Sequence, residues 1–465
     1  MEDIEALIKK AQSFERKISS SSSNKENILL AVHHDADGLA SATILCDYIQ
    51  RKGGHCQIRT TSEPSPKFLD KLASSHFDLV IFVDICAGLS GEIGKKFGDK
   101  WLVIDHHEIP ENEMDEEKVL NPWQFDLDGN SQISSSGLAY FICEKSRVPS
   151  TAFLAIVGAL GDRQDNGPRR TLTGLNSKIL DEDSDSFKAI DSRIDLLFWC
   201  REARPVHESI ANTVTSYIPG LTGNKDACLA SLRSAGIEIR TNNRWKTVAG
   251  FNEEEKKQLL ECIVPHLSGT TNTVEDLVGT AYTYRSLDEH SMMRDTRDAA
   301  ALLNACGRMG KPGLGIALCL GFDNGFGNGV EQVFTEYRTE LIRSVQYLMS
   351  SEDRIHEKNE YLLVIGDGVV SERMTGAVCQ LMSNYSRVKN KVVILRTTTV
   401  DGDVKVSVRS GREVGDRDLG RAMMEVARAT NGVGGGLRNS AGARFSIVRQ
   451  QEFQAMVDEL FRQRK

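Results

Sequence analysis

The sequence predicts an α/β protein whose main domain is built around a parallel β-sheet. Continuous apolar runs of strand length occur at residues 28–32, 79–83 and 102–104, and stretches with helical periodicity separate them. Strands that are apolar throughout are typical of parallel sheets covered by helices on both faces. In such sheets ligands bind beyond the carboxyl ends of the strands. Functional residues are therefore expected directly after these three runs.

Composition and charge narrow the possible classes of function. The 465 residues correspond to two to four domains at roughly 100 to 200 residues each, and 40% apolar with 26% charged residues excludes a disordered chain. The net charge of −8 repels phosphate, so a nucleic-acid ligand needs a local basic patch. From Asp401 onward twelve Lys and Arg residues outnumber nine Asp and Glu residues, and phosphate contacts are expected there.

The cysteines and the hydropathy pattern indicate a cytoplasmic protein. The ten cysteines are scattered and no CxxC pair occurs, which is typical of small apolar residues in a reducing compartment. No apolar run reaches the roughly 18 residues of a membrane span, and the charged N-terminal segment lacks the apolar core of a secretion signal. We therefore expect no membrane partner.

The first 200 residues carry the elements of the sheet domain. Residues 1–18 have the apolar spacing of an amphipathic helix, and the serine run at 19–23 predicts a flexible link before the first strand. A helical period over residues 39–49 follows that strand, and a long apolar stretch at 152–160 precedes a further acidic cluster. Residues 1–200 are therefore assigned to this domain.

The pattern changes between residues 201 and 290, where strand runs become rare and Gly and Pro are frequent. Asn252 and Glu255 resemble a capping box at the start of an apolar helical period. This segment is interpreted as a mainly helical insertion with a possible role in binding a partner. The first domain is expected to continue after it, at about residues 291–325.

The last part of the chain predicts a second, smaller α/β domain. A long periodic stretch indicates a linker helix within residues 326–358. New runs of strand length begin at Tyr361 and recur at 392–395 and 404–408. Residues 359–465 are therefore assigned to a C-terminal α/β domain.

Side chains that can bind metal ions follow the predicted strands. A spacing of two along an extended chain places His33, Asp35 and Asp37 on one face, where they can converge. A lone Asp at a strand end is usually a cap or turn residue, but several carboxylates at one sheet edge repel one another unless cations neutralise them. The four clusters are His33-His34-Asp35-Ala36-Asp37-Gly38, Asp84, Asp105-His106-His107 and Gly161-Asp162-Arg163-Gln164-Asp165.

The types of these side chains predict which ion they bind. Carboxylate together with imidazole favours Mn²⁺ or Mg²⁺ over a structural thiolate zinc site. Two such ions about 3.5 to 4 Å apart can activate water and stabilise the leaving oxygen of a phosphoester. The sequence therefore predicts a two-ion centre with phosphoesterase chemistry.

The four clusters resemble the motifs of the DHH phosphoesterase superfamily in their order and approximate spacing, and the Asp105-His106-His107 cluster matches the motif that names it. Three further segments resemble archaeal RecJ-like nucleases, including the GINS-associated nuclease. They are Leu302–Gly310, Gly315–Gly321 and Ile218–Gly223. The resemblance extends from about residue 28 to the end of the chain. It implies a parallel-sheet DHH domain with the helical insertion, the linker helix and a DHH-associated domain.

The resemblance also implies roles for the motif residues. The ligands of two Mn²⁺ or Mg²⁺ ions would be Asp35, Asp37, Asp84, His106 and Asp162. Asp84 would be the bridging carboxylate and so part of the catalytic machinery. His33 has three possible roles, as a ligand, as a substrate contact or as a packed strand residue. His107 would face the scissile phosphate as hydrogen-bond donor or general acid, or would support the sheet edge.

The C-terminal domain resembles the DHH-associated domain, which implies that it binds the substrate chain. Its glycine-rich segment contains Gly434, Gly435, Gly436 and Arg438, and a second family element is Arg409-Ser410. Successive glycines let backbone N–H groups approach a phosphate, and Arg adds a charge-assisted fork. Many relatives have His where this chain has Leu437, so one expected phosphate contact is missing.

The leading hypothesis is a metal-dependent exonuclease that degrades single-stranded DNA or RNA, linked to DNA replication or repair. One alternative is a phosphodiesterase for very short oligonucleotides or cyclic dinucleotides. Another is a replisome component that binds a GINS-type partner through the insertion, with secondary nuclease activity. Three arginines near the Leu302–Gly310 segment could line a nucleic-acid path or form a solvated helix face. They are Arg294, Arg297 and Arg308.

Overall fold

A computed structural model describes residues 2–62, 64–109, 115–321, 326–415 and 417–461. The chain forms two compact units, each made of two segments. The first unit contains Met1–Asp195 and Gly279–Phe334, and the second contains Leu196–Val278 and Thr335–Lys465. Within the described residues no helix combines the length and the apolar character that crossing a membrane requires.

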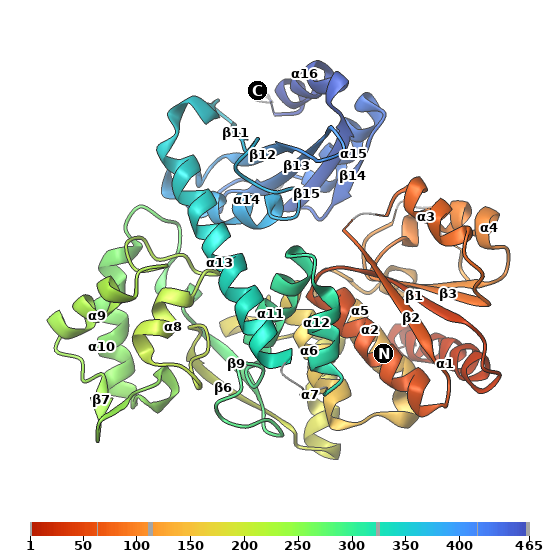
Figure 1. Ribbon diagram of the computed structural model, residues 1–465, viewed down its shortest axis with the longest axis horizontal. Helices are drawn as coiled ribbons and strands as arrows, with labels where there is room; N and C mark the ends of the chain where they lie inside the picture. The colour runs from red at the N-terminus through yellow and green to blue at the C-terminus, as the bar shows by residue number, and fades with distance from the viewer. Residues whose placement is uncertain (1, 63, 110–114, 322–325, 416, 462–465) are drawn as a thin grey trace. The chain divides into compact units, whose positions relative to one another are not determined.

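The first unit is built on a five-stranded sheet in which every neighbouring pair of strands is parallel. Its strand order is β2-β1-β3-β4-β5, seen as the red and orange arrows of Figure 1. The strands are β1 (Ile28–His33), β2 (Cys56–Thr61), β3 (Leu79–Val83), β4 (Trp101–Ile104) and β5 (Val119–Leu120). β3 and β4 are buried along their whole length, as the apolar runs indicate. The predicted α/β class with a parallel sheet is confirmed.

Helices complete the first unit. Those nearest the functional residues are α2 (Ala36–Arg51), α5 (Ser135–Ile142), α6 (Pro149–Gly161) and α11 (Thr296–Arg308), which pack against one another. The others are α1 (Glu2–Ser23), α3 (Pro66–Ala73), α4 (Ser90–Phe97), α7 (Gly174–Ser186) and α12 (Pro312–Cys319). A separate two-stranded sheet pairs β6 (Ile190–Leu196) with β9 (Val278–Tyr284).

The serine run at 19–23 differs from its predicted structure. The local pattern predicts a flexible link, but the run is the last turn of α1. The Ser22 hydroxyl donates to the Ile18 carbonyl oxygen at 2.7 Å, and the Ser21 and Ser22 side chains are buried. Packing and this back-bond offset the low helix propensity of serine, which local sequence alone does not reveal.

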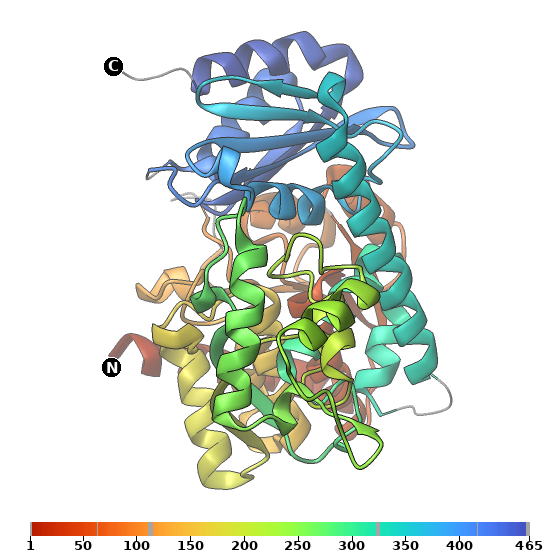
Figure 2. The same cartoon turned by 90° about the vertical axis from the view of Figure 1, so that its left-hand side faces the viewer.

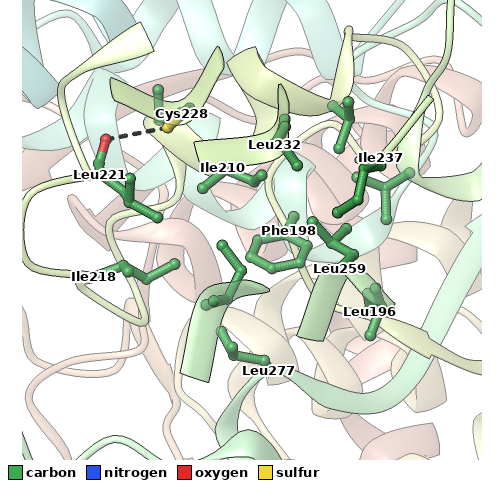
Figure 3. Close-up of a cluster of buried hydrophobic side chains, with 14 of the residues drawn as sticks. Leu196, Phe198, Ile210, Ile218, Leu221, Cys228, Leu232, Ile237, Leu259 and Leu277 are labelled. Atoms are coloured by element: carbon green, nitrogen blue, oxygen red, sulfur yellow. Dashed lines mark hydrogen bonds between the residues drawn. The ribbon is translucent and has the colours of Figure 1, made fainter. Parts of the chain in front are cut away.

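The insertion is mainly helical and has its own hydrophobic core, shown in Figure 3. Phe198, Leu232 and Leu259 are among the side chains that meet there. The predicted capping box is present, because Asn252 and Glu255 each accept the other's backbone N–H. The elements are α8 (Val206–Asn212), α9 (Lys225–Ser234), α10 (Glu253–Ile263) and the small hairpin β7 (Arg240–Thr241) and β8 (Arg244–Trp245).

The second unit also contains most of the linker helix and the C-terminal domain. The helix α13 (Phe326–Ser350) is the unbroken teal helix of Figure 2. Helices α14 (Thr375–Ser383), α15 (Leu419–Thr430) and α16 (Gln450–Leu460) accompany a six-stranded sheet of order β10-β11-β12-β13-β15-β14. Its strands are β10 (Ile355–Glu357), β11 (Tyr361–Ile365), β12 (Val392–Thr398), β13 (Asp403–Ser410), β14 (Val433–Gly436) and β15 (Ser440–Ser446). Among the described strands of this sheet, only β11 and β12 pair in parallel.

Candidate metal centre

Three of the four acidic clusters meet at the carboxyl edge of the parallel sheet. β1 ends at His33, β3 ends one residue before Asp84, and β4 ends one residue before Asp105. Because β1, β3 and β4 are adjacent and parallel, their last residues share one edge. Asp35 caps helix α2 and accepts the Gly38 N–H at 3.1 Å.

The fourth cluster reaches the same place from helix α6. Asp162 follows the last residue of α6, and its Oδ2 lies 3.0 Å from His106 Nε2. Helix α6 approaches the first motif very closely, since a Cβ atom at Gly158 would lie 2.2 Å from Asp37 Oδ1. A glycine is therefore required at this point of the helix for the buried Asp37 carboxylate to fit.

Asp84 lies at the middle of the cluster and presents one oxygen to each side. Its Oδ2 is 3.4 Å from His33 Nδ1, and its Oδ1 is 3.4 Å from His106 Nε2. The backbone of Asp84 adopts a left-handed φ of 63°, which turns the chain at the end of β3. Only one per cent of the Asp84 side chain is exposed. This carboxylate is thus shared by three overlapping sets of side chains.

In each of these sets the side chains lie close enough together to hold one metal ion. In each, the nitrogen and oxygen atoms offered by the side chains lie within 4.8 Å of one another. One set contains Asp37, Asp84, His106 and Asp162, a second contains His33, Asp35 and Asp84, and a third contains Asp84, His106 and His107. The structure therefore brings together all six side chains expected to hold metal.

The donor atoms of the cluster fit divalent cations. His33 Nδ1, Asp84 Oδ2 and His106 Nε2 are buried, and none has a hydrogen-bond partner in the described part of the chain. His33 Nδ1 does lie 2.7 Å from Asp35 Oδ2, but without hydrogen-bond geometry. Buried polar atoms without partners are rare and costly. Imidazole nitrogen and carboxylate oxygen are suitable ligands for Mn²⁺, and the carboxylates also suit Mg²⁺.

Burial and repulsion raise the pKa values of two carboxyl groups in the cluster. The pKa of Asp37 is well above its usual range because of burial and then of the Asp84 and Asp162 charges. Burial raises the pKa of Asp162 to about 6, although the neighbouring His106 imidazole opposes this. Burial would lower the pKa of His106, but Asp162 and Asp84 outweigh it and raise that pKa. A divalent cation would replace the protons that these groups otherwise hold.

His107 lies at the exposed rim of the cluster. Its side chain is 43% exposed, and its Nδ1 is 2.7 Å from Asp105 Oδ1 and 4.0 Å from Asp84 Oδ1. Asp105 also accepts the backbone N–H of Ala87 at 3.1 Å and of His107 at 3.2 Å. Asp105 therefore orients His107 and does not point into the ligand sets.

The start of helix α5 supports the cluster in a way that sequence reasoning missed. The backbone N–H groups of Ser135 and Ser136 donate to Asp37 at 2.7 and 3.0 Å, and the Ser135 hydroxyl donates to Asp84 Oδ1 at 3.1 Å. Ser134 caps this helix. Serine before an apolar helical run is a recognisable cap pattern, but it does not say which distant carboxylate the helix end will meet.

Helix α11 explains the Leu302–Gly310 segment noted in the sequence. The Asn304 side-chain oxygen accepts the Ala36 N–H at 3.1 Å, at the start of α2. A Cβ atom at Gly307 would lie 1.6 Å from the His34 carbonyl oxygen, so only glycine fits there. This helix therefore holds the first motif in place.

His106 is oriented from behind by backbone and amide groups. Its Nδ1 lies 2.6 Å from the Gly129 carbonyl oxygen, which also accepts a hydrogen bond from Gln164 at 2.9 Å. A contact of this kind fixes the ring so that Nε2 faces the ligand set.

Arg297 neither lies on a solvated helix face nor is available to line a nucleic-acid path, because it is paired inside the first unit. Its Nη1 lies 2.7 Å from Asp165 Oδ2, and Arg170 Nε lies 2.8 Å from the same oxygen. Burial would raise the pKa of Asp165, but Arg297 and Arg170 outweigh it and lower that pKa. The side chain of Arg297 therefore stabilises the loop after Asp162.

The residues predicted to bind substrate gather at one end of the C-terminal sheet. Arg409 and Ser410 end strand β13, and the Ser410 N–H donates to the Asn439 carbonyl oxygen at 3.1 Å. Gly434–Gly436 form the edge strand β14, directly before the turn that contains the exposed Arg438. The two sequence elements are therefore neighbours in space.

Three sequence families match separate parts of the chain. Residues 27–160 match the N-terminal domain of the DHH family, residues 198–278 match the DHH-CID domain, and residues 359–463 match the DHHA1 domain. A curated relative, an uncharacterized protein of Methanocaldococcus jannaschii, is 29% identical over 441 residues and matches 93% of each chain.

Solved structures share the fold across nearly the whole chain. CDC45 from Entamoeba histolytica superposes with a TM-score of 0.63 at 12% identity, covering 98% of this chain and 99% of that one. RecJ from Thermus thermophilus in complex with Mn²⁺ gives a TM-score of 0.58 at 15% identity, covering 97% of this chain and 54% of that one. The chain thus spans about half the length of that RecJ.

Proposed function

Because the chain is a DHH-family protein with a RecJ-like fold, we propose that it is a divalent-metal-dependent exonuclease acting on single-stranded DNA or RNA. The observation that carries this proposal is the position of Asp84, whose two oxygens face His33 and His106 at 3.4 Å each. One carboxylate shared by two ligand sets is what a pair of cations at a phosphodiester requires.

The proposed roles of the ligand residues follow from the two main sets. Asp37, His106 and Asp162 would hold one cation, His33 and Asp35 would hold the other, and Asp84 would contact both. When bound, such cations lower the pKa of a water molecule and neutralise charge on the phosphoryl oxygens.

His107 is proposed to contact the scissile phosphate. It is the most exposed member of the ligand sets, and Asp105 holds its ring through Nδ1. A histidine fixed in this way can donate a hydrogen bond to a phosphate oxygen or a proton to the leaving oxygen. We expect His107→Gln to reduce the rate of hydrolysis more than it reduces substrate affinity.

The C-terminal sheet is proposed to grip the substrate strand through its phosphates. The backbone N–H groups of Gly434–Gly436 and the side chains of Arg409, Ser410 and Arg438 supply suitable donors. Aromatic residues make up only 6% of the chain, so base stacking contributes little and binding should weaken steeply with salt.

Degradation of end-labelled single-stranded DNA and RNA in a length series tests this proposal. We expect stepwise shortening of long strands with Mn²⁺ or Mg²⁺ and none with a chelator. Activity confined to two- to five-residue oligonucleotides, or to cyclic dinucleotides, would replace the proposal by the short-substrate phosphodiesterase. The same gels give the polarity and the preference for DNA or RNA.

A second candidate function is binding of a GINS-type replication factor through the insertion. The hydrophobic core of the insertion favours it, because side chains of this segment form a buried cluster among themselves (Figure 3). The Leu197 N–H donates to the Leu277 carbonyl oxygen at 2.8 Å, so the two ends of the insertion adjoin. Replacing residues 198–276 by a short linker should therefore remove partner capture and leave hydrolysis of a short oligonucleotide intact.

A further inference from the structure

Two cysteine thiols of the first unit are in contact with each other. Cys46 lies in the second half of helix α2, and Cys56 is the first residue of strand β2. All ten cysteines of the chain are free thiols, and the Cys56 thiol donates a hydrogen bond to the Cys46 sulfur. Neither cysteine belongs to the metal-binding sets. The metal centre therefore leaves this contact unexplained.

The fold fixes the two cysteines beside each other. Helix α2 contacts strand β2, and the short connection between them turns at Gly53, whose φ is 78°. The Lys25 ammonium donates to the Gly53 carbonyl oxygen. A Cβ atom at Gly54 would lie 2.8 Å from the Ser22 Cα atom, so the turn packs tightly against the end of α1. The thiol contact is thus built into the strand-helix-strand unit.

Cys46 is the more acidic thiol of the pair. The hydrogen bond from Cys56 lowers the pKa of Cys46, although burial and the Asp47 charge oppose this. The Gln50 amide also donates to the Cys46 sulfur, at 3.6 Å, and hydrogen bonds to the charged form favour it. The contact with Cys46, together with burial, raises the pKa of Cys56. Because the thiolate is the reactive form of cysteine, Cys46 is the nucleophile.

The pair lies at an edge of the sheet that a small oxidant can reach. Strand β2 is the first strand of the five-stranded sheet and is paired on one side only. Cys56 is half-buried, and Cys46 is 5% exposed behind it.

A second pair of cysteines, in the insertion, provides a matched comparison. Cys228 is buried and Cys262 is half-buried. The Cys228 thiol donates to the Leu221 carbonyl oxygen at 3.4 Å (Figure 3). Burial raises the pKa of Cys228 to about 12, and the nearby Cys262 adds to this. These two thiols therefore share the burial of the first pair but lack an activated sulfur.

From these contacts we propose that Cys46 and Cys56 form a reversible disulfide, which makes them a redox modification site. With hydrogen peroxide as the oxidant, the Cys46 thiolate takes one oxygen atom and becomes a sulfenic acid, and the released hydroxide takes up the proton that Cys46 had lost. The Cys56 thiol then attacks this sulfur, so that the S–S bond forms, the S–O bond breaks and water leaves with the Cys56 proton. Two thiols and one peroxide thus give one disulfide and two water molecules. This inference is independent of the proposed hydrolysis.

Peptide mapping of the full-length chain without reductant tests the site. Trypsin cleaves after Arg51 and Lys52, so Cys46 and Cys56 fall on peptides 26–51 and 53–59, which contain no other cysteine. The chain is treated briefly with peroxide in chelator, and the remaining thiols are then blocked in denaturant. We expect mass spectrometry to find these two peptides joined, with two hydrogen atoms lost, and dithiothreitol to separate them. Cys228 and Cys262 should carry the blocking group.

Two serine variants assign the roles within the pair. Cys56→Ser should leave Cys46 as a sulfenic acid that dimedone traps, whereas Cys46→Ser should leave no sulfenic acid at Cys56. Peroxide should raise the melting temperature of the wild type, because the disulfide constrains the unfolded chain, and neither variant should show this rise. The control Cys228→Ser should keep both the joined peptides and the rise. Melting temperatures in dithiothreitol show that each variant is folded.

Three results would overturn the proposal. They are no joining of the two peptides, equal joining of Cys228 to Cys262, and joining of Cys46 or Cys56 only between separate chains. The second result would mean that peroxide oxidises any neighbouring thiols, and the third that the contact within the chain is not the reacting one.

Discussion

Asp162 and Asp165 are three residues apart, yet the protein compensates the partly exposed carboxylate of Asp162 and the buried carboxylate of Asp165 in different ways. Asp165 lies against two guanidinium groups, those of Arg297 and Arg170. Among the described residues, Asp162 forms its ion-pair contact with His106, and it shares its surroundings with Asp37 and Asp84. Their pKa values accordingly move in opposite directions, because the arginines lower that of Asp165 while burial raises that of Asp162 to about 6.

The two sites differ in whether side chains of the protein neutralise the carboxylate charge. At Asp165 the chain supplies its own cations, and the site contributes to folding as it stands. At the Asp84 cluster the chain supplies carboxylates and imidazoles but no described guanidinium group, so like charges lie close together there. Arginine side chains could neutralise these carboxylates as they do at Asp165. Their absence among the described side chains of this cluster leaves room for mobile divalent ions.

The largest expected effect is that of Asp84→Ala on hydrolysis. A divalent cation supplies several kcal/mol of transition-state stabilisation, so its loss should slow hydrolysis by at least about 10³- to 10⁴-fold. The melting temperature in chelator should stay the same or rise, because one of the repelling charges is gone. Rates with Mn²⁺ and thermal unfolding in chelator measure both effects. A variant that cuts as fast as the wild type would refute the metal assignment.

Asp165→Ala should have the opposite effect to Asp84→Ala, because it should lower the free energy of unfolding strongly. It leaves Arg170 and Arg297 without their carboxylate, and breaking a buried ion pair costs about 3 to 5 kcal/mol. Urea denaturation gives the change in the free energy of unfolding. The control Asp181→Ala removes an exposed carboxylate on α7 and should change stability by no more than about 0.5 kcal/mol. Equal effects of the two substitutions would remove the distinction drawn between the two sites.

Added Mn²⁺ should raise the free energy of unfolding of the wild type, and this gain should depend on Asp84 but not on Asp165. At a free concentration one hundred times the Kd, one bound ion adds about 2.7 kcal/mol to the free energy of unfolding. Asp84→Ala should lose most of this increment, whereas Asp165→Ala should keep it. Thermal unfolding over a Mn²⁺ series measures it, and an increment that survives in Asp84→Ala would place the ions elsewhere.

The sequence predicts that the four clusters meet, because continuous apolar runs indicate parallel strands and parallel strands end at one edge. The structure brings those side chains together, while their catalytic roles stay predictions. The difference between Asp162 and Asp165 could not be foreseen. Both follow the same helix, and the deciding partner, Arg297, is 132 positions away from Asp165. Local patterns carry no information about such a distant contact.

The supporting contacts of the cluster were beyond sequence reasoning for the same reason. Asn304 meets Ala36 across 268 positions, and Ser135 meets Asp37 across 98. The serine run at 19–23 is a further case in which local sequence predicts the wrong structure. Tertiary packing makes it helical despite its local preference for irregular structure.

The stabilising effect of Asp165 should depend on pH in a definite sense. Its pKa is lowered in the folded state, so its contribution is complete above the unfolded value of about 3.9. That contribution is lost as the pH falls from the unfolded pKa through the folded pKa, at up to about 1.4 kcal/mol per pH unit. The stability gap between wild type and Asp165→Ala should thus be constant from pH 8 to about 5 and narrow below about 4. A gap that narrows toward alkaline pH would contradict this assignment.

The smallest expected effect distinguishes two adjacent serines in helix α5. The Ser135 hydroxyl donates to Asp84 Oδ1 at 3.1 Å, whereas the Ser136 hydroxyl donates to the Ala155 carbonyl oxygen at 3.0 Å. Both backbone N–H groups donate to Asp37 and survive replacement by Ala. A hydrogen bond to a charged group contributes about 1.5 to 3 kcal/mol, part of which serves to orient Asp84. Ser135→Ala should therefore reduce hydrolysis roughly tenfold and raise the Mn²⁺ concentration needed for half-maximal activity. Ser136→Ala should reduce stability and leave that concentration unchanged. If both variants shifted the Mn²⁺ requirement equally, the effect would come from the helix and not from the hydroxyl that faces Asp84.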